Sequence, residues 1–396
     1  MPEIVLKECL KVYVRETHRS REPASTLEFV QRIERIAGIE EMVEITGIDG
    51  TSIPAFMCRR TRPDGSVTTH TGKGLNAIQA RVSLTMEAIE RYSSEYRDEY
   101  YGKLVRGSFA DLRQKENVLN PEELILSRFS EYRPESEYFW MSGYDLIGGN
   151  DILVPACEVY HPFAPDEFLL VHTHTNGLAS GNTIEEAIFH ALCELIERDA
   201  WSIAKFRDAP DDAVLVENLP ENAFLIDLID RFENAGIRVV AKDITTEIGV
   251  PVIAAFSTDE RYPEMMVTDG FGAHLDPKAA LARALLELAV TRAVFLKKYG
   301  PEGLRESFPP GIEEDNRFFC EREVALGDMA FRYTKDVRLD IGIILEKLRT
   351  CGFQRVIVVG LTREDTGVPV VRVIVPGLEN YCFDRGRQGP RLLGSE

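Results

Sequence analysis

One pattern recurs three times along this chain and restricts its fold more than any other feature of the sequence. Each copy has a helix-forming segment that ends in glycine, then a strand-forming segment, then a second strand that begins at a proline. Glycine favours the left-handed cap of a helix C-terminus, and proline is tolerated where a strand begins. The pattern predicts helix–strand–strand modules in a mixed α/β (α+β) fold, and both internal duplication and independent use of a common unit explain it. The copies are residues 27–57 with Gly38 and Pro54, residues 224–256 with Gly236 and Pro251, and residues 344–375 with Gly352 and Pro369.

Longer helix-forming segments accompany these modules, because apolar residues recur there at helical spacing. They are residues 77–100, residues 183–206 after an Asn182/Thr183 cap, and residues 276–299, which begin Asp276-Pro277. Residues 301–325, interrupted by proline and glycine, are expected to form a loop, and residues 385–396 a loose basic tail. Since no low-complexity linker divides the chain, we expect a single composite domain over residues 1–396.

Composition excludes several classes of protein. The 65 acidic and 46 basic residues give a net charge of −19, which disfavours binding to nucleic acid or to anionic membranes. No apolar run reaches the roughly 18 residues of a membrane-spanning helix, and the charged start MPEIVLKECLKVYVRE does not resemble a signal peptide. The seven scattered cysteines are typical of reduced thiols in a cytoplasmic protein.

Two of the long helices carry the same pair of acidic residues. Glu87 and Glu90 form one pair, Glu194 and Glu197 the other, and an arginine follows each pair. Residues three apart share a helix face, and two neighbouring carboxylates need a cation when they are partly buried. Oxygen ligands without nearby sulfur favour Mg²⁺ over zinc, and four carboxylates on facing helices could hold ions that bridge polyphosphate oxygens. The alternative is that each pair lies on a solvated helix face.

Other candidate residues are individually less specific. Arg283 and Glu287 on the third helix can pair with each other, or bind a phosphate and approach the metal ions. Glycine-rich turns precede the first two helices, where free N–H groups favour anions, although neither turn matches a Walker A or GxGxxG motif. His172 and His174 would share a strand face, and we expect a hydrogen-bonded rather than a metal-binding role for them.

Together these segments resemble the YcaO family over about residues 12–382. The first ATP-site motif of the family is similar to Gly72-Lys73-Gly74 followed by Ser83-x3-Glu87-x2-Glu90-Arg91. The second resembles Asn176-Gly177-x-Ala179-x-Gly181-x4-Glu186-Ala187-x6-Glu194-x2-Glu197-Arg198-Asp199, and the third Arg283-x3-Glu287. The amino-terminal segment Thr17-His18-Arg19-x-Arg21-x-Pro23-x2-Thr26 and the closing Val368-Pro369-Val370-Val371-Arg372 are also similar to the family. The motifs lie within residues 12–100, 170–210 and 270–382.

The resemblance implies a YcaO fold built around a non-Walker ATP site, with ATP and Mg²⁺ as cofactors. Its implied metal ligands are Glu87, Glu90, Glu194 and Glu197. Its implied nucleotide contacts are Arg19, Thr26, Ser83, Asn176, Arg198, Arg283 and Glu287. Arg91 is expected to orient the first acidic pair, the role of Lys73 is less defined, and no residue is assigned as the general base.

The resemblance also implies a reaction. Members of the family phosphorylate the oxygen of a peptide backbone amide, a nucleophile adds to the carbonyl carbon, and phosphate leaves. A neighbouring Cys, Ser or Thr gives an azoline, whereas an external sulfide source gives a thioamide.

Two departures from azoline-forming members favour the thioamide product. The chain has no fused peptide-recognition module and ends in GPRLLGSE rather than a Pro-x-Pro-x-Pro terminus. It is similar to the stand-alone archaeal thioamidating group, which implies a TfuA-like sulfur-delivery partner and, in methanogens, a glycine of the methyl-coenzyme M reductase alpha subunit as substrate. A homodimer is also expected from the family. The alternatives are an azoline-forming cyclodehydratase and a non-catalytic ATP-binding accessory factor.

Overall fold

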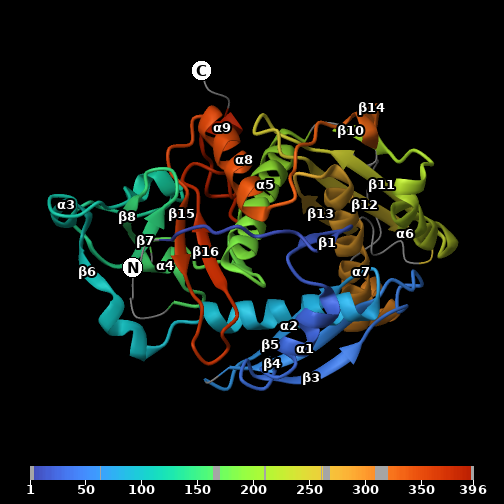
Figure 1. Ribbon diagram of the computed structural model, residues 1–396, viewed down its shortest axis with the longest axis horizontal. Helices are drawn as coiled ribbons and strands as arrows, with labels where there is room; N and C mark the ends of the chain where they lie inside the picture. Colours follow the sequence, from blue (N-terminus) through green and yellow to red (C-terminus); the bar gives the residue numbers. More distant parts are fainter. Residues whose placement is uncertain are drawn as a thin grey trace. The chain divides into compact units, whose positions relative to one another are not determined.

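The chain divides into two compact units, each built from segments far apart in the sequence (Figure 1). Unit 1 contains Met1–Leu10, Ile89–Arg207 and Asp336–Glu396, and unit 2 contains Lys11–Ala88 and Asp208–Lys335. The structure, a computed structural model, describes residues 4–62, 64–163, 170–208, 211–259, 261, 268–307 and 320–393. The predicted mixed α/β fold is confirmed in both units.

Unit 2 contains a five-stranded sheet of order β13-β12-β11-β10-β14, a three-stranded sheet β3-β4-β5 and the small ribbon β1-β2. Its strands are β1 (Tyr13–Val14), β2 (His18–Arg19), β3 (Ile39–Glu44), β4 (Ala55–Thr61), β5 (Val67–Lys73), β10 (Asp211–Leu215), β11 (Ile237–Asp243), β12 (Val252–Asp259), β13 (Thr268–Ala273) and β14 (Cys320–Ala325). Its α-helices are α1 (Pro23–Val30), α6 (Ala223–Asn234) and α7 (Pro277–Ser307), and its 3₁₀ turns are Pro220–Asn222 and Leu326–Asp328. Helix α2 (Ala77–Ser94) begins in this unit and ends in unit 1.

Unit 1 contains one sheet of order β6-β7-β15-β16-β9, with β8 paired to β7. Its strands are β6 (Val105–Ser108), β7 (Glu137–Asp145), β8 (Asn150–Pro155), β9 (Leu178–Ser180), β15 (Ile357–Gly360) and β16 (Val370–Ile374). Its helices are α3 (Phe109–Leu112), α4 (Ala156–Val159), α5 (Ile184–Arg207), α8 (Val337–Thr350) and α9 (Pro390–Leu393), with 3₁₀ turns at Asp98–Lys103 and Pro121–Leu124.

Each predicted helix–strand–strand module proves to be part of a larger repeated unit. A third antiparallel strand and a long helix complete every copy. The copies are α1, β3-β4-β5 and α2; α6, β11-β12-β13 and α7; and α8, β15-β16-β9 and α5. In the last copy, β9 and α5 precede α8 in the chain, so that copy is circularly permuted.

The three sheets share one register. The residue after each module's proline pairs with the last residue of the third strand: Ala55 with Lys73, Val252 with Ala273, and Val370 with Ser180. The next N–H then donates to the proline carbonyl, from Gly74 at 3.3 Å, His274 at 3.1 Å and Gly181 at 3.0 Å. Independent use of a common unit requires only the same topology. An identical register in all three copies therefore favours internal duplication.

The predicted helix ends of the second and third modules are correct, and that of the first module is wrong. Helices α6 and α8 are followed by Gly236 and Gly352, both with positive φ. In the first module, however, α1 ends at Val30 and turns lead to Gly38. The predicted loop 301–325 is wrong at both ends, because a helix restarts after the break at Gly300 and Cys320–Ala325 form β14. Residues 308–319 lie outside the described residues.

The expected loose tail is also wrong over its described part. Arg387 is buried and its Nε donates to Ile125 O at 2.9 Å. Arg391 forms an ion pair with the buried Asp199 at 2.7 Å. The basic side chains are therefore anchors that fix this segment to unit 1, and only residues 394–396 of the predicted tail lie outside the described part.

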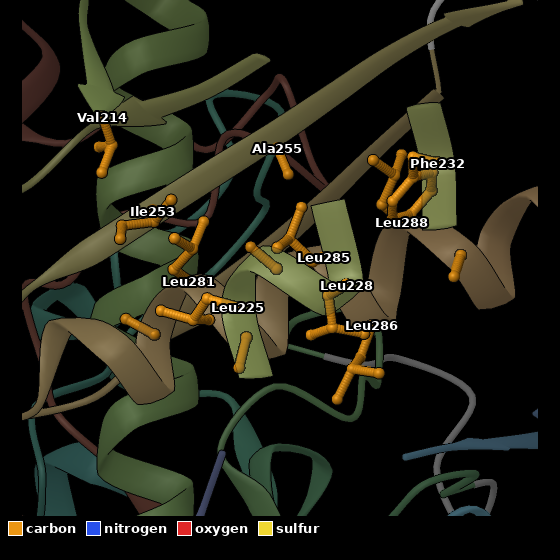
Figure 2. Close-up of a cluster of buried hydrophobic side chains, with 14 of the residues drawn as sticks. Val214, Leu225, Leu228, Phe232, Ile253, Ala255, Leu281, Leu285, Leu286 and Leu288 are labelled. Atoms are coloured by element: carbon orange, nitrogen blue, oxygen red, sulfur yellow. The ribbon is translucent and has the colours of Figure 1, made fainter. Parts of the chain in front are cut away.

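The core of unit 2 surrounds helix α7. Leu281, Leu285 and Leu288 of α7 are fully buried against α6 residues Leu225, Leu228 and Phe232 and against Ile253 of β12 (Figure 2). Further along α7, Val290 and Ala293 pack on Ile45 and on Ala55 of β4. Helix α7 thus covers two sheets of the unit, and burial of this apolar surface stabilises its position.

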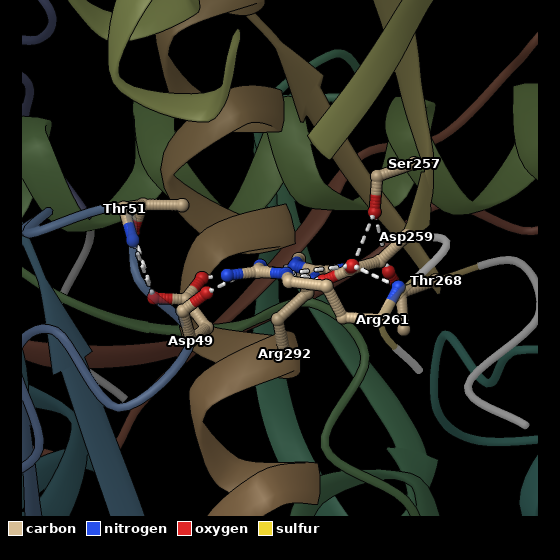
Figure 3. Close-up of polar contacts among 7 residues, drawn as sticks. All are labelled: Asp49, Thr51, Ser257, Asp259, Arg261, Thr268 and Arg292. Carbon is tan, nitrogen blue, oxygen red and sulfur yellow. Dashed lines mark hydrogen bonds and ion pairs between the residues drawn. The ribbon is translucent and has the colours of Figure 1, made fainter. Parts of the chain in front are cut away.

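A buried arginine fixes α7 to strand β12 and to the loop between β3 and β4 (Figure 3). Arg292 Nη2 lies 2.6 Å from Asp259 Oδ2, and its Nη1 donates to Ser257 Oγ at 3.1 Å. On its other side, Arg292 Nε lies 3.7 Å from Asp49 Oδ2. Since all three charged side chains are buried, their pairing is required to offset the cost of removing them from water.

Candidate functional site

The family motifs lie where the third strand of each copy passes into its long helix. Glycine brings strand and helix together there, since a Cβ at Gly72 would overlap Ala80 O and Leu84 N of α2. Gly272 of β13 has the same relation to Ala280 O and Ala284 N of α7. These junctions place the first turns of the motif helices directly beside their strands.

Each motif helix also begins at a polar cap, as the sequence indicates for α5 and α7. Asn76 Oδ1 accepts a hydrogen bond from Gln79 N at 3.1 Å, Thr183 Oγ1 from Glu186 N at 3.2 Å, and Asp276 Oδ1 from Lys278 N at 2.9 Å. Such caps satisfy N–H groups that have no partner within the helix. The three motif helices therefore begin at corresponding points of the repeated unit.

Equivalent helix positions carry the acidic residues. Glu87, Glu194 and Glu287 each lie thirteen residues after the residue that bonds the proline carbonyl. Three residues further on, the first two helices have Glu90 and Glu197, whereas α7 has Val290. The repeat thus relates the two acidic pairs to each other and relates Glu287 to the first member of each pair.

The second glutamate of each pair is buried beside its own arginine. Glu90 is 7% exposed and Glu197 is 2% exposed. Arg91 Nη1 lies 3.4 Å from Glu90 Oε1, and Arg198 Nη1 lies 3.4 Å from Glu197 Oε1. Ser180 N also donates to Glu90 Oε2 at 3.0 Å. Buried carboxylates with arginine neighbours contradict the alternative of a solvated helix face for these two residues.

The first motif glutamate of each helix, at positions 87, 194 and 287, is more accessible than the second glutamate of either pair. Glu87 Oε1 lies 3.5 Å from His70 Nδ1 of β5, and Glu194 is half-buried. Glu287 Oε2 accepts a hydrogen bond from Lys73 Nζ at 3.1 Å. The contact between Lys73 and Glu287 links the GKG turn to the third motif.

The remaining unit 2 candidates lie on four elements. Arg19 is in β2, Thr26 is buried in α1 with its hydroxyl 3.5 Å from Glu22 O, and Ser83 is half-buried in α2. Arg283 is on the first turns of α7, and a Cβ added at Gly272 would overlap the Cβ of Arg283.

The unit 1 candidates lie before β9 and on α5. Asn176 is 5% exposed and its Nδ2 donates to Asn380 Oδ1 at 2.6 Å. Asn176 Oδ1 is buried and has no hydrogen-bond partner among the residues that the structure describes. The guanidinium of Arg198 lies 5.4 Å from the ring centres of both Trp201 and Phe383, which restricts its side chain through cation–π contact.

The metal assignment rests on the donor chemistry of single residues. Within the described ranges, no three His, Cys, Asp or Glu side chains form a group that could hold a metal ion. The oxygen donors on α2 and α5 nevertheless fit Mg²⁺, and buried Glu90 and Glu197 require positive charge nearby. The four metal ligands and seven nucleotide contacts therefore stay predictions.

Sequence reasoning missed a buried ionic network near Asn176. His174 Nε2 lies 3.1 Å from Glu158 Oε2, and Arg387 Nη2 lies 3.7 Å from Glu158 Oε1. Burial alone would raise the pKa of Glu158, but His174, Arg387 and Arg372 lower it to about 2. The one sequence signal was Arg372 itself, a lone charge in the apolar run VVRVIV. The paired role expected for His174 agrees with this geometry.

Comparison with known proteins identifies the chain's relatives. Residues 71–379 match the family described as YcaO cyclodehydratase, ATP- and Mg²⁺-binding. An uncharacterized protein of Methanothermobacter thermautotrophicus is 40% identical over 387 residues, covering 94% of this chain and 98% of that protein. A protein encoded in the tfuA 3′ region of Rhizobium leguminosarum bv. trifolii is 29% identical, over 91% of this chain and 88% of the relative.

Solved structures similar to this chain belong to the same family or share its fold. The structure of YcaO from Methanopyrus kandleri bound with AMPPCP and Mg²⁺ is 31% identical, with a TM-score of 0.77 over 96% of this chain and 98% of that one. A heterocyclase in complex with substrate and cofactor shares the fold with a TM-score of 0.81 at 22% identity, over 98% of this chain and 56% of that one.

The chain is therefore a member of the YcaO family, a class of ATP-dependent enzymes. The prediction of ATP and Mg²⁺ as cofactors is confirmed by the family description and by the bound groups of the Methanopyrus relative.

Proposed function

We propose that this chain uses Mg²⁺-ATP to activate a backbone amide of a peptide and forms a thioamide there. ATP supplies the phosphoryl group that turns the amide oxygen into a leaving group, and an external sulfide source supplies the sulfur. The observation that carries the proposal is the repeated acidic pair, present at equivalent positions of α2 and α5 and buried at Glu90 and Glu197. Phosphoryl transfer depends on such charge compensation and positioning.

The residues take the following roles in this proposal. Glu87, Glu90, Glu194 and Glu197 would hold Mg²⁺, with Arg91 and Arg198 balancing their charge. Asn176 would offer its free Oδ1 to the nucleotide. The other nucleotide contacts would be Arg19, Thr26, Ser83, Arg198, Arg283 and Glu287.

The proposed substrate is a glycine of the methyl-coenzyme M reductase alpha subunit, modified in the cytoplasm by a homodimer. Relatives in Methanothermobacter and Methanopyrus, at 40% and 31% identity, support this choice, because the resemblance associates the substrate with methanogens. The relative from a tfuA 3′ region supports a TfuA-like partner for sulfur delivery.

The second candidate is azoline formation by the same amide activation. It is favoured by the family description as a cyclodehydratase. In that reaction the nucleophile is a side chain of the peptide itself, so no sulfide and no sulfur-delivery partner is needed.

Reconstitution with mass spectrometry distinguishes these functions. The purified chain, a TfuA-like protein, Mg²⁺-ATP, sulfide and a glycine-containing reductase peptide should give a peptide in which one oxygen is replaced by sulfur. Loss of one water from a peptide containing Cys, Ser or Thr would establish the azoline reaction instead. ATP binding without any change in either peptide would overturn both the thioamide and the azoline proposals. It would favour the remaining alternative, a non-catalytic ATP-binding accessory factor.

A further inference from the structure

Arg372 is buried beneath the loop that carries Asn176. This arginine of β16 is 0% exposed, and each of its side-chain nitrogens donates to a main-chain carbonyl. Nη1 bonds Asn176 O at 2.7 Å, Nη2 bonds His174 O at 2.7 Å, and Nε bonds Val159 O at 3.2 Å. A guanidinium presents its donors in a rigid fork, so these bonds fix the loop relative to α4 and β16.

Glu158 supplies the opposing charge. It is buried next to Val159, and its pKa of about 2 keeps it ionised at neutral pH. Burial lowers the pKa of Arg372 to about 10, while the charge of Glu158 acts against that shift. Arg372 therefore remains cationic. His174 links the two charged residues, because its Nε2 lies 3.1 Å from Glu158 Oε2 and its main-chain carbonyl accepts a hydrogen bond from Arg372 Nη2.

The loop backbone leaves little freedom at Asn176. Val373 N donates to Gly177 O at 2.7 Å, directly beside Arg372. Gly177 has φ +77°, and a Cβ there would overlap Val373 O. The main chain on both sides of Asn176 is thus held by β16, while the side chain keeps a buried acceptor, Oδ1, without a partner in the described residues.

We propose that Arg372 is a positioning residue for nucleotide binding, which acts by holding the main chain of Asn176. The inference rests on the proposed contact between Asn176 and the nucleotide. Arg372 itself bonds protein carbonyls with all its donors and is not expected to touch the nucleotide. Affinity for ATP should therefore depend on a residue nearly 200 positions away from the loop that it orders.

Calorimetric titration with Mg²⁺-AMPPCP tests the inference in the full-length chain. Asn176→Ala and Arg372→Lys should each weaken binding roughly tenfold, because each removes or misplaces one polar contact. The double variant should bind no more weakly than Asn176→Ala, since both changes act through the same contact. Independent, multiplicative losses would overturn the inference.

Arg363→Lys is the matched control. Arg363 is also buried in unit 1, and its Nη2 donates to the main-chain Glu95 O at 2.7 Å. Loss of this buried hydrogen bond should lower the melting temperature but leave affinity for AMPPCP unchanged. If Arg372→Lys behaves in the same way, Arg372 is structural only and the inference fails.

The outcomes also separate this inference from the proposed function. Unchanged affinity in Asn176→Ala would overturn the nucleotide contact and everything that depends on it, whereas weakened binding there with unchanged binding in Arg372→Lys would overturn positioning alone. If Arg372→Lys does not fold, Glu158→Gln replaces it, because it keeps the shape but removes the charge facing Arg372. The loss of affinity for AMPPCP caused by Glu158→Gln should likewise disappear when Asn176→Ala is already present. A further loss of affinity in that double variant would contradict the inference.

Discussion

Individual side chains at the candidate site show how buried charge is compensated. Glu90 and Glu197 each lie against the arginine that follows them in sequence. Glu158 is compensated by positively charged residues distant in sequence, among them Arg372. A carboxylate out of water needs such partners, so each pair marks a position where substitution has a defined cost.

The acidic pairs are predicted to be essential for ATP turnover. Glu87→Gln or Glu197→Gln removes a charge of the proposed metal site and should reduce the rate of ATP hydrolysis by about 10²-fold or more. Phosphate release in the presence of the peptide measures this rate. Glu185→Gln is the control, because Glu185 is buried on the same helix but accepts a hydrogen bond from Lys7 N. Turnover that survives both changes would contradict the metal assignment.

Glu158 should contribute to stability in a pH-dependent way. Its pKa falls from 4.5 in the unfolded chain to about 2 in the fold, so its contribution is complete above pH 4.5 and is lost as the pH falls towards 2. Urea unfolding should show the gap between the wild type and Glu158→Gln narrowing over that range. Glu346→Gln, an exposed change on α8, should show no such trend, and a pH-independent gap for Glu158→Gln would count against its pairing.

Among the elements, the repeated strand–helix junction decides where the motifs lie. Its glycines bring backbone against backbone, and its caps set the first turn of each motif helix. Much of this could be predicted, because a glycine cap and a proline at a strand entrance are local signals. The third strand of the permuted copy could not, because β9 pairs with β16 across almost half the chain.

The distinction between local signals and distant contacts also explains the predictions that were wrong. Residues 301–307 were expected to be a loop because proline and glycine break helices, yet proline also starts them. The tail residue Arg391 was expected to be loose because the sequence does not show that Asp199 lies within reach. The sequence indicates Arg372 only as part of the closing motif and not its contacts. Its partners are the main-chain carbonyls of Val159 and Asn176, which lie far away in sequence.

Substitution by alanine should change the stability of the fold in opposite directions at two glycines. Gly72→Ala would force a Cβ into the backbone of α2 and should destabilise the fold by at least about 2 kcal/mol. Gly342 lies within α8 with open space around it, so Gly342→Ala should stabilise by about 0.5–1 kcal/mol. Thermal unfolding of both variants measures this. Equal effects would show that β5 does not pack on α2 as described.

Removal of the buried Arg292 of α7 should destabilise the fold more than the Gly72→Ala substitution. Arg292→Met leaves Asp259 and Asp49 buried without that charge and should lower the free energy of unfolding by about 3–5 kcal/mol. Arg261→Met is the control, since Arg261 contacts the same Asp259 but is 45% exposed, and it should cost about 1 kcal/mol or less. Similar losses for the two variants in urea titrations would refute the structural role of Arg292.

At the scale of the whole molecule, the chain carries a net charge of −19 and folds as two compact units. Within the described part of the chain, no helix is both long enough and apolar enough to cross a membrane. The family's motifs are divided between the two units, with Glu87, Arg283 and Glu287 in unit 2 and Asn176, Glu194 and Glu197 in unit 1. Ligand binding is therefore best followed on the complete chain.

Mg²⁺-AMPPCP should stabilise the complete chain by mass action. At a free concentration of about 100 times the dissociation constant, the gain is about 2.7 kcal/mol, visible as a higher melting temperature. Chelation of Mg²⁺ by EDTA should remove most of it, because the carboxylates then repel the phosphates. Equal stabilisation with and without Mg²⁺ would contradict a metal site formed by the four glutamates.

The permuted copy has a consequence for how the chain is made. The first two copies are continuous, from α1 to α2 and from α6 to α7, so each can form soon after its own residues leave the ribosome. The strand after Asn176 must instead wait for Val370–Ile374, which are synthesised near the end. Pairing between such distant strands is slow, so the loop that carries Asn176 should stay without its β16 contacts until translation is almost complete.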